Sequence, residues 1–140
     1  MMMDDGFVRA FFASYLHRLA SMVEATEAFA FGLSEGKDDV HFALIQHIRP
    51  GGAKPEVMET ARRAFIEIAR PCVAAGKSGA IEIEELDHGK PPQFCLVVPL
   101  VDRQRVAGVI GLISRCENMD QAKRKLAVIS VWAPRLGDSR

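Results

Sequence analysis

Two apolar runs joined by a short polar turn lie in the C-terminal half of the chain. Residues 94–101 and residues 106–114 are almost wholly apolar, and the polar residues 102–105 separate them. Two runs of strand length around a short polar turn are typical of a β-hairpin. Neither run alternates cleanly between apolar and polar positions, so both faces of the hairpin need cover. We therefore expect this hairpin at the centre of a sheet that lies between two layers.

Three more segments have the pattern of strands. Residues 27–33 alternate with a period of two, with small residues on one face and large residues on the other: Ala28, Ala30 and Gly32 against Phe29, Phe31 and Leu33. The small face would let a helix lie close, and the large face would fill a core or wall a pocket. Residues 40–49 predict an edge strand, because His41 and His47 on one face indicate that this face is partly wet. Residues 80–85 alternate as well.

Three segments have helical periodicity. Apolar residues recur at intervals of three and four over residues 7–23 and again over residues 119–136. Pro55 stands just inside the start of a central helix, which we expect Pro71 to kink or end and Gly76 to close.

The last predicted helix has a cap and an apolar stripe with two possible uses. Asn118 and Gln121 stand in the arrangement of a capping box. The apolar residues follow the three-four spacing of a coiled-coil seam: Met119, Ala122, Leu126, Ile129, Ala133 and Leu136. Packing of this stripe on the chain's own sheet explains the spacing equally well.

The order of the elements predicts an α+β fold with a mostly antiparallel sheet of five to six strands. The chain has 140 residues and a mass of 15.4 kDa, which suits one domain over residues 1–140 with a core at 27–114. A longer protein could continue the last helix, so we also hold the hypothesis that the chain is a fragment.

Charge and composition exclude several classes of partner. Eighteen basic residues balance eighteen acidic ones, which argues against nucleic acid and against direct contact with an anionic membrane. The acidic start and the lack of an apolar run of roughly 18 residues predict a cytoplasmic location. Three cysteines without a CxxC pair argue against a disulfide framework.

The central hairpin resembles the C-terminal half of a GAF domain. In that family a strand with a Pro-Leu pair, a polar turn and a "vGVigl" strand precede a long helix; Pro99-Leu100 and Val106 to Leu112 match here. The resemblance implies a sheet of order 2-1-5-4-3, with the terminal helices on one face, where they often form a dimer interface. It implies a small-molecule pocket on the other face, under the central helix. The sequence has neither the NKFDE-like motif of cyclic-nucleotide-binding members nor a cysteine placed for a bilin linkage, so the cofactor, if any, is unknown.

Candidate site residues follow from these faces. Four phenylalanines could line a pocket for a planar ligand: Phe29, Phe31, Phe65 and Phe94. The residues expected around the mouth of this pocket are Met58, Cys72 and His88. A filled core explains the phenylalanines as well. The predicted dimer interface comprises Phe11, Tyr15, Leu19, Leu126, Ile129 and Trp132.

Reactive side chains give little sign of catalysis. Some GAF-fold proteins reduce free methionine sulfoxide with loop cysteines, and of the three cysteines Cys116, beside Arg115, has the best electrostatic setting for a thiolate. Cys72 and Cys95 have the pattern of core thiols. The four histidines lack the spacing of metal ligands. We therefore expect a non-enzymatic sensory or regulatory module that binds a small molecule or forms a signal-linked homodimer. The alternatives are a ligand-free dimerisation module and a small thiol-based reductase.

Overall fold

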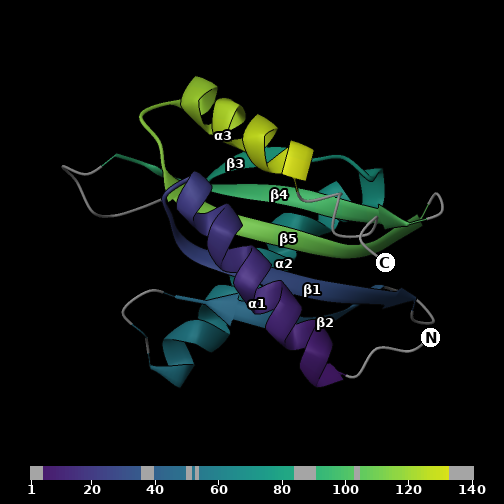
Figure 1. Ribbon diagram of the computed structural model, residues 1–140. Helices are drawn as coiled ribbons and strands as arrows, with labels where there is room; N and C mark the ends of the chain where they lie inside the picture. Colours follow the sequence, from purple (N-terminus) through teal and green to yellow (C-terminus); the bar gives the residue numbers. More distant parts are fainter. Residues whose placement is uncertain are drawn as a thin grey trace.

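The computed structural model describes residues 5–35, 40–49, 52, 54–83, 91–102 and 105–132 (Figure 1). Within these ranges the side chains of residues 5–13, 35, 102, 105 and 132 lie outside the description. The elements are, in chain order, α1 (Asp5–Met22), β1 (Ala25–Glu35), β2 (Val40–Ile48), α2 (Pro55–Ala75), β3 (Gly79–Ile83), β4 (Gln93–Asp102), β5 (Arg105–Arg115) and α3 (Met119–Trp132).

The strands form one antiparallel five-stranded sheet of order β2-β1-β5-β4-β3. The predicted α+β class and strand order are therefore confirmed. The apolar hairpin β4–β5 lies inside the sheet, as its lack of alternation required, and β2 is an edge strand. Residues 84, 85 and 133–136, which the sequence placed in a strand and a helix, lie outside the described residues.

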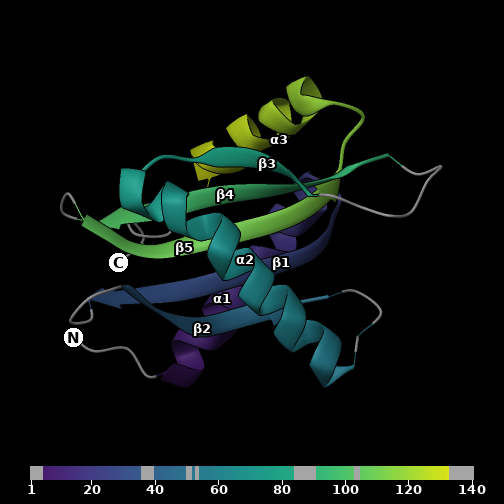
Figure 2. The same ribbon diagram turned by 180° about the vertical axis from the view of Figure 1, so that it is seen from behind.

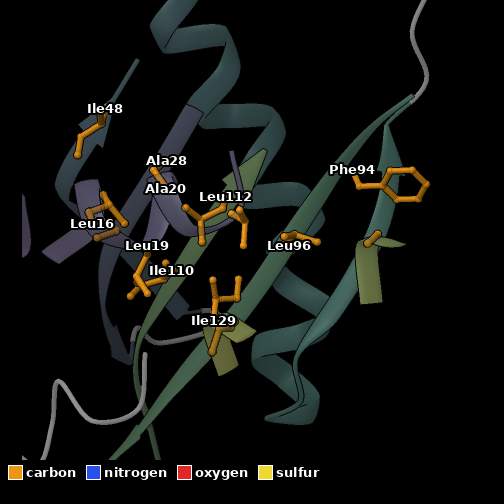
Figure 3. Packing of buried hydrophobic residues seen from close by; sticks show 14 of the residues in the cluster. Leu16, Leu19, Ala20, Ala28, Ile48, Phe94, Leu96, Ile110, Leu112 and Ile129 are labelled. Carbon is orange, nitrogen blue, oxygen red and sulfur yellow. The ribbon is translucent and has the colours of Figure 1, made fainter. Parts of the chain in front are cut away.

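Helices cover both faces of the sheet (Figures 1 and 2). α1 and α3 lie on one face and α2 crosses the other, as the resemblance implied. The small face of β1 lies under α1, where Ala28 and Ala30 join a core with Leu16, Leu19 and Ile129 (Figure 3). The large face of β1 points toward α2, where Phe29 and Phe31 belong to a second core. In β1, the face with small residues thus packs against α1, and the face with large residues packs against α2.

Helix α2 continues through Pro71 to Ala75, so of the two predicted effects, a kink or an end at Pro71, the end is wrong. Pro71 is exposed, and the buried residues on either side of it, Ala69 and Val73, hold both parts of the helix against the sheet. The helix ends at Gly76, which has the left-handed conformation at φ 65°. The Gly76 and Lys77 N–H groups donate to the carbonyls of Val73 and Cys72, the pattern of a Schellman cap.

Helix α3 has the predicted N-terminal cap: the hydrogen bond from the Gln121 backbone to the Asn118 side chain is present. The Asn118 Oδ1 accepts from the Gln121 N–H at 2.9 Å. The Gln121 Oε1 reaches back to the Glu117 N–H at 2.6 Å, one residue before the cap. Two backbone donors at the start of the helix are therefore satisfied by side chains.

An irregularity in β2 changes which of its residues face α2. Ala30 of β1 pairs with Gln46, whereas the next residue, Phe31, pairs with Leu44, so β2 carries one extra residue here. His47 consequently lies on the α2 face, stacked on Phe29. The prediction that His47 shares a face with His41 is wrong, because a period-two count does not anticipate a bulge.

Candidate functional site

Four phenylalanines fill the space between α2 and the sheet; we call them the aromatic layer, and they are Phe29, Phe31, Phe42 and Phe65. The Phe65 ring lies parallel to two rings from β1, with centroids 4.8 Å from Phe29 and 5.5 Å from Phe31. Phe42 of β2 meets Phe31 edge-on at 6.0 Å. These separations are those of rings in direct contact.

Gly111 of β5 provides the room for the Phe65 ring. A Cβ atom at position 111 would lie 1.8 Å from Cε2 of Phe65. The ring therefore rests on bare backbone, and the contact requires glycine at this position. The sheet and α2 are joined here by an aromatic ring.

The predicted ligand-binding residues do not all come together. Phe29, Phe31 and Phe65 come together under α2, and the half-buried Cys72 packs against the same core. Met58 is half-buried in the first part of α2. His88 lies outside the described residues.

Phe94 lies on the other face of the sheet, so its grouping with the other phenylalanines is wrong. It belongs to the core under α1 and α3, together with Leu96 and Val98 (Figure 3). Successive residues of a strand point to opposite faces. Its neighbours Cys95 and Val97 face α2 instead.

A polar cluster that the sequence did not reveal adjoins the aromatic layer; it comprises Glu27, His47, Arg49 and Arg62. The His47 Nε2 lies 2.7 Å from Glu27 Oε1, and Arg62 Nε donates to His47 Nδ1 at 3.1 Å. The His47 side chain is 1% exposed and that of Glu27 is 10% exposed. Arg49 Nη1 lies 3.8 Å from the same Glu27 oxygen. The cluster thus links β1, the end of β2 and α2.

The hydrogen bonds fix the tautomer of His47. A guanidinium group only donates, so Nδ1 accepts from Arg62 and carries no proton. The proton of the neutral ring is then on Nε2, which donates to Glu27. Burial lowers the pKa of His47, the hydrogen bond to Glu27 and its charge oppose this, and the nearby Arg62 and Arg49 lower the pKa further. Burial and the two arginines therefore favour the neutral form of the ring.

The three thiols are shielded from solvent to different extents, and two of them have a raised pKa. Cys95 is fully buried, and burial raises its pKa to about 12, with smaller contributions from Cys72 and Glu27. Burial also raises the pKa of Cys72. Cys116 is 1% exposed, and its Sγ donates to the Ser114 carbonyl at 3.8 Å. Nucleophilic cysteines need the opposite conditions, which are access and a lowered pKa.

Two of the residues predicted to form a dimer interface lie in the core. Leu19 is 1% exposed and Ile129 is 0% exposed, and both pack on the sheet (Figure 3). The prediction is wrong for these two, because the apolar stripe of each helix covers the chain's own sheet. Tyr15 and Leu126 are half-buried against the same core. The side chains of Phe11 and Trp132 lie outside the described residues.

The outer surface of α3 carries apolar side chains that the sequence marks as further apolar surface of this helix, beside the predicted interface residues. Val128 is 41% exposed and Val131 is 56% exposed, and Ala127 beside them is also exposed. Positions 127, 128 and 131 lie on one face of a helix. The sequence shows that Val128 and Val131 are apolar, and the structure shows that they point outward.

Two further features are absent from the described part of the chain. No group of three or more His, Cys, Asp and Glu side chains there could hold a metal ion. None of the described helices combines the length and apolarity needed to cross a membrane.

The comparisons with known proteins report on the fold. No family model and no curated protein matches the sequence. Among solved structures, the nlh2 GAF domain of A. aeolicus in an inactive state has 14% identity and a TM-score of 0.60, with 98% of this chain and 84% of that chain covered. The gliding protein MglB of Thermus thermophilus has 11% identity and a TM-score of 0.56 over 100% and 96% of the two chains, and another MglB structure has a tetrameric arrangement.

An enzyme has the same fold. The type II free methionine-R-sulfoxide reductase of Thermoplasma acidophilum has 13% identity and a TM-score of 0.54, with 98% of this chain and 96% of that chain covered. Identities this low concern the fold alone, and the fold extends over nearly the whole chain. The resemblance found in the sequence is thereby confirmed: the chain has a GAF-like α+β fold.

Proposed function

We propose that the chain is a regulatory module of GAF-like fold that acts by forming a homodimer through the outer surface of α3 beside α1. The observation that carries the proposal is the exposed apolar stripe Ala127, Val128 and Val131. Met22, at the end of α1 on the same face of the sheet, is 45% exposed. Burial of such side chains in a self-complementary, two-fold interface would stabilise a dimer.

The aromatic layer supports a module that works without a small-molecule ligand. The Phe65 ring occupies the space above Gly111, and the rings of Phe29 and Phe31 stack against it at centroid distances of 4.8 and 5.5 Å. A ligand in this space would have to displace a buried phenylalanine. This favours the ligand-free dimerisation module over the small-molecule sensor.

The thiols support a function without catalysis. Cys95 and Cys116 are buried, and the raised pKa of Cys95 and Cys72 leaves little thiolate at neutral pH. The three cysteines are free, which fits a reducing compartment, and we place the module in the cytoplasm.

Native mass spectrometry of the purified protein tests this proposal, because it reads the subunit number and any retained mass together. We expect a dimer without added mass. Val131→Lys should convert it to a monomer, since the lysine would place a charge in the apolar interface. Val101→Lys is the matched control, because Val101 is also 56% exposed but lies in β4, and it should remain dimeric.

The other outcomes each exclude part of the proposal. A wild-type monomer at all concentrations would rule out homodimerisation. A dimer that Val131→Lys leaves intact would place the interface elsewhere. A reproducible retained small molecule would favour the sensor.

A further inference from the structure

We infer that His47 is a proton-operated latch that holds the first half of α2 on the sheet. The ring lies between two layers: its Nε2 bonds to Glu27 of β1 and its Nδ1 accepts from Arg62 of α2. Both nitrogen atoms are engaged, and the side chain is 1% exposed. The latch lies on the opposite face of the sheet from the proposed dimer interface and is independent of it.

Protonation changes the two bonds of His47 in opposite ways. A proton on Nδ1 turns the acceptor into a donor and brings a positive ring within 3.1 Å of the positive Arg62, so this bond is lost. The bond to Glu27 becomes an ion pair and is kept. The protonated ring is therefore tied to the sheet alone.

The surrounding charges allow Arg62 to leave. Arg62 also pairs with Glu59 of its own helix at 3.7 Å, so it keeps a partner when it separates from His47. Arg49 faces the same Glu27 oxygen from the end of β2 and adds to the positive charge around the ring. Glu27 is the acidic group that opposes these two arginines. The cluster thus has one arrangement with α2 attached and one with Arg62 turned to Glu59.

The sign of the pH dependence follows from linkage. The pKa of His47 is lowered in the folded protein, so the unfolded chain binds the proton more readily. Stability conferred by the neutral ring is present above the unfolded value of about 6.5 and is lost as the pH falls below it toward the folded pKa. Acid should therefore loosen α2, beginning at the turns around Arg62.

Nitrogen-15 NMR of the histidine rings, combined with hydrogen exchange of α2 peptides, tests the latch. At pH 7.5 we expect His47 to have the proton on Nε2. Between pH 7.5 and 5.0, after correction for intrinsic exchange, protection of residues 55–65 should fall by about fivefold or more relative to residues 66–75. The fall should follow the titration of His47.

Two variants and one control separate the latch from general acid sensitivity. His47→Gln should abolish the differential fall, whereas His41→Gln, an exposed histidine of the same strand, should leave it unchanged. If His47→Gln does not fold, Arg62→Met is the alternative variant, because it removes the partner of Nδ1 and keeps the titrating ring. In Arg62→Met the hydrogen exchange of residues 55–65 should no longer follow the titration of His47. A proton on Nδ1 at pH 7.5 would overturn the inference. So would a wild-type fall that persists in His47→Gln or in Arg62→Met.

Discussion

The ring of Phe65 rests on the backbone of Gly111, so that at this position no side chain of β5 lies between the strand and α2. The ring is at the same time stacked against two rings of β1, Phe29 and Phe31. It cannot move away from Gly111 without disturbing the rest of the aromatic layer. This contact sets the distance between α2 and the sheet.

Gly111→Ala should therefore destabilise the fold strongly, because the new Cβ would lie 1.8 Å from the Phe65 ring. Overpacking of this kind costs about 1–3 kcal/mol of the free energy of unfolding, and this site belongs at the upper end. Urea denaturation measures the loss. Gly32→Ala is the matched control, because its Cβ would meet Ile45 Cδ1 at an ordinary 3.6 Å.

The same explanation predicts strong coupling between the two residues. Phe65→Ala alone should cost about 3–5 kcal/mol, because it leaves a cavity. In the Phe65→Ala background, Gly111→Ala should cost little or nothing, since the clashing ring is gone. Additive losses in the double variant would show that the clash is not the cause.

Neighbouring positions of α3 should respond differently to truncation. Ile129→Ala removes a side chain that is 0% exposed and should lower the free energy of unfolding by about 2–5 kcal/mol. Val131→Ala should change it by less than about 0.5 kcal/mol at protein concentrations where the chain is monomeric. Equal losses at the two positions would contradict the assignment of inner and outer faces.

Ser114→Ala should destabilise the fold although it removes a single oxygen atom. The fully buried hydroxyl donates to the Val23 carbonyl at 2.7 Å and accepts from Lys125 Nζ at 2.9 Å. Removing it leaves the carbonyl without this donor, at a cost of about 1–3 kcal/mol in thermal or urea unfolding. Ser78→Ala, at an exposed position, should be near neutral.

The thiols should resist alkylation in the folded protein. With a pKa of about 12, Cys95 is almost wholly protonated at pH 8, and burial also blocks access. Iodoacetamide at pH 8 should modify the half-buried Cys72 first and leave Cys95 and Cys116 until the chain is unfolded in urea. Native-state reaction of Cys95 or Cys116 at the rate of a free thiol would revive the reductase alternative.

The strand order and layers could be predicted because they depend on side-chain size and period. Ala28 and Ala30 against Phe29 and Phe31 mark the two faces of β1, and the hairpin β4–β5 is apolar on both faces because it is central. Each of these patterns is local, so one stretch of sequence is enough to read it.

The site could not be predicted to the same extent, because it depends on contacts between distant segments. One extra residue in β2 places His47 against Phe29, and only the fold brings Arg62 and Glu27 to it. The coiled-coil spacing that includes Ile129 fits an own-sheet contact and a partner contact equally well, and burial decides for the former. The prediction that Phe94 lines the pocket failed, because residue type alone does not tell which face of the sheet a side chain lies on.

The order of the strands also has a consequence for synthesis of the chain. β1 is one of the first strands to be made, yet its neighbour on one side is β5, which ends at Arg115. Until that residue leaves the ribosome, the β1–β2 pair has an open edge and lacks the central strand that joins it to β4. The sheet therefore closes late, through contacts between residues far apart in the chain, and contacts of this kind generally form slowly.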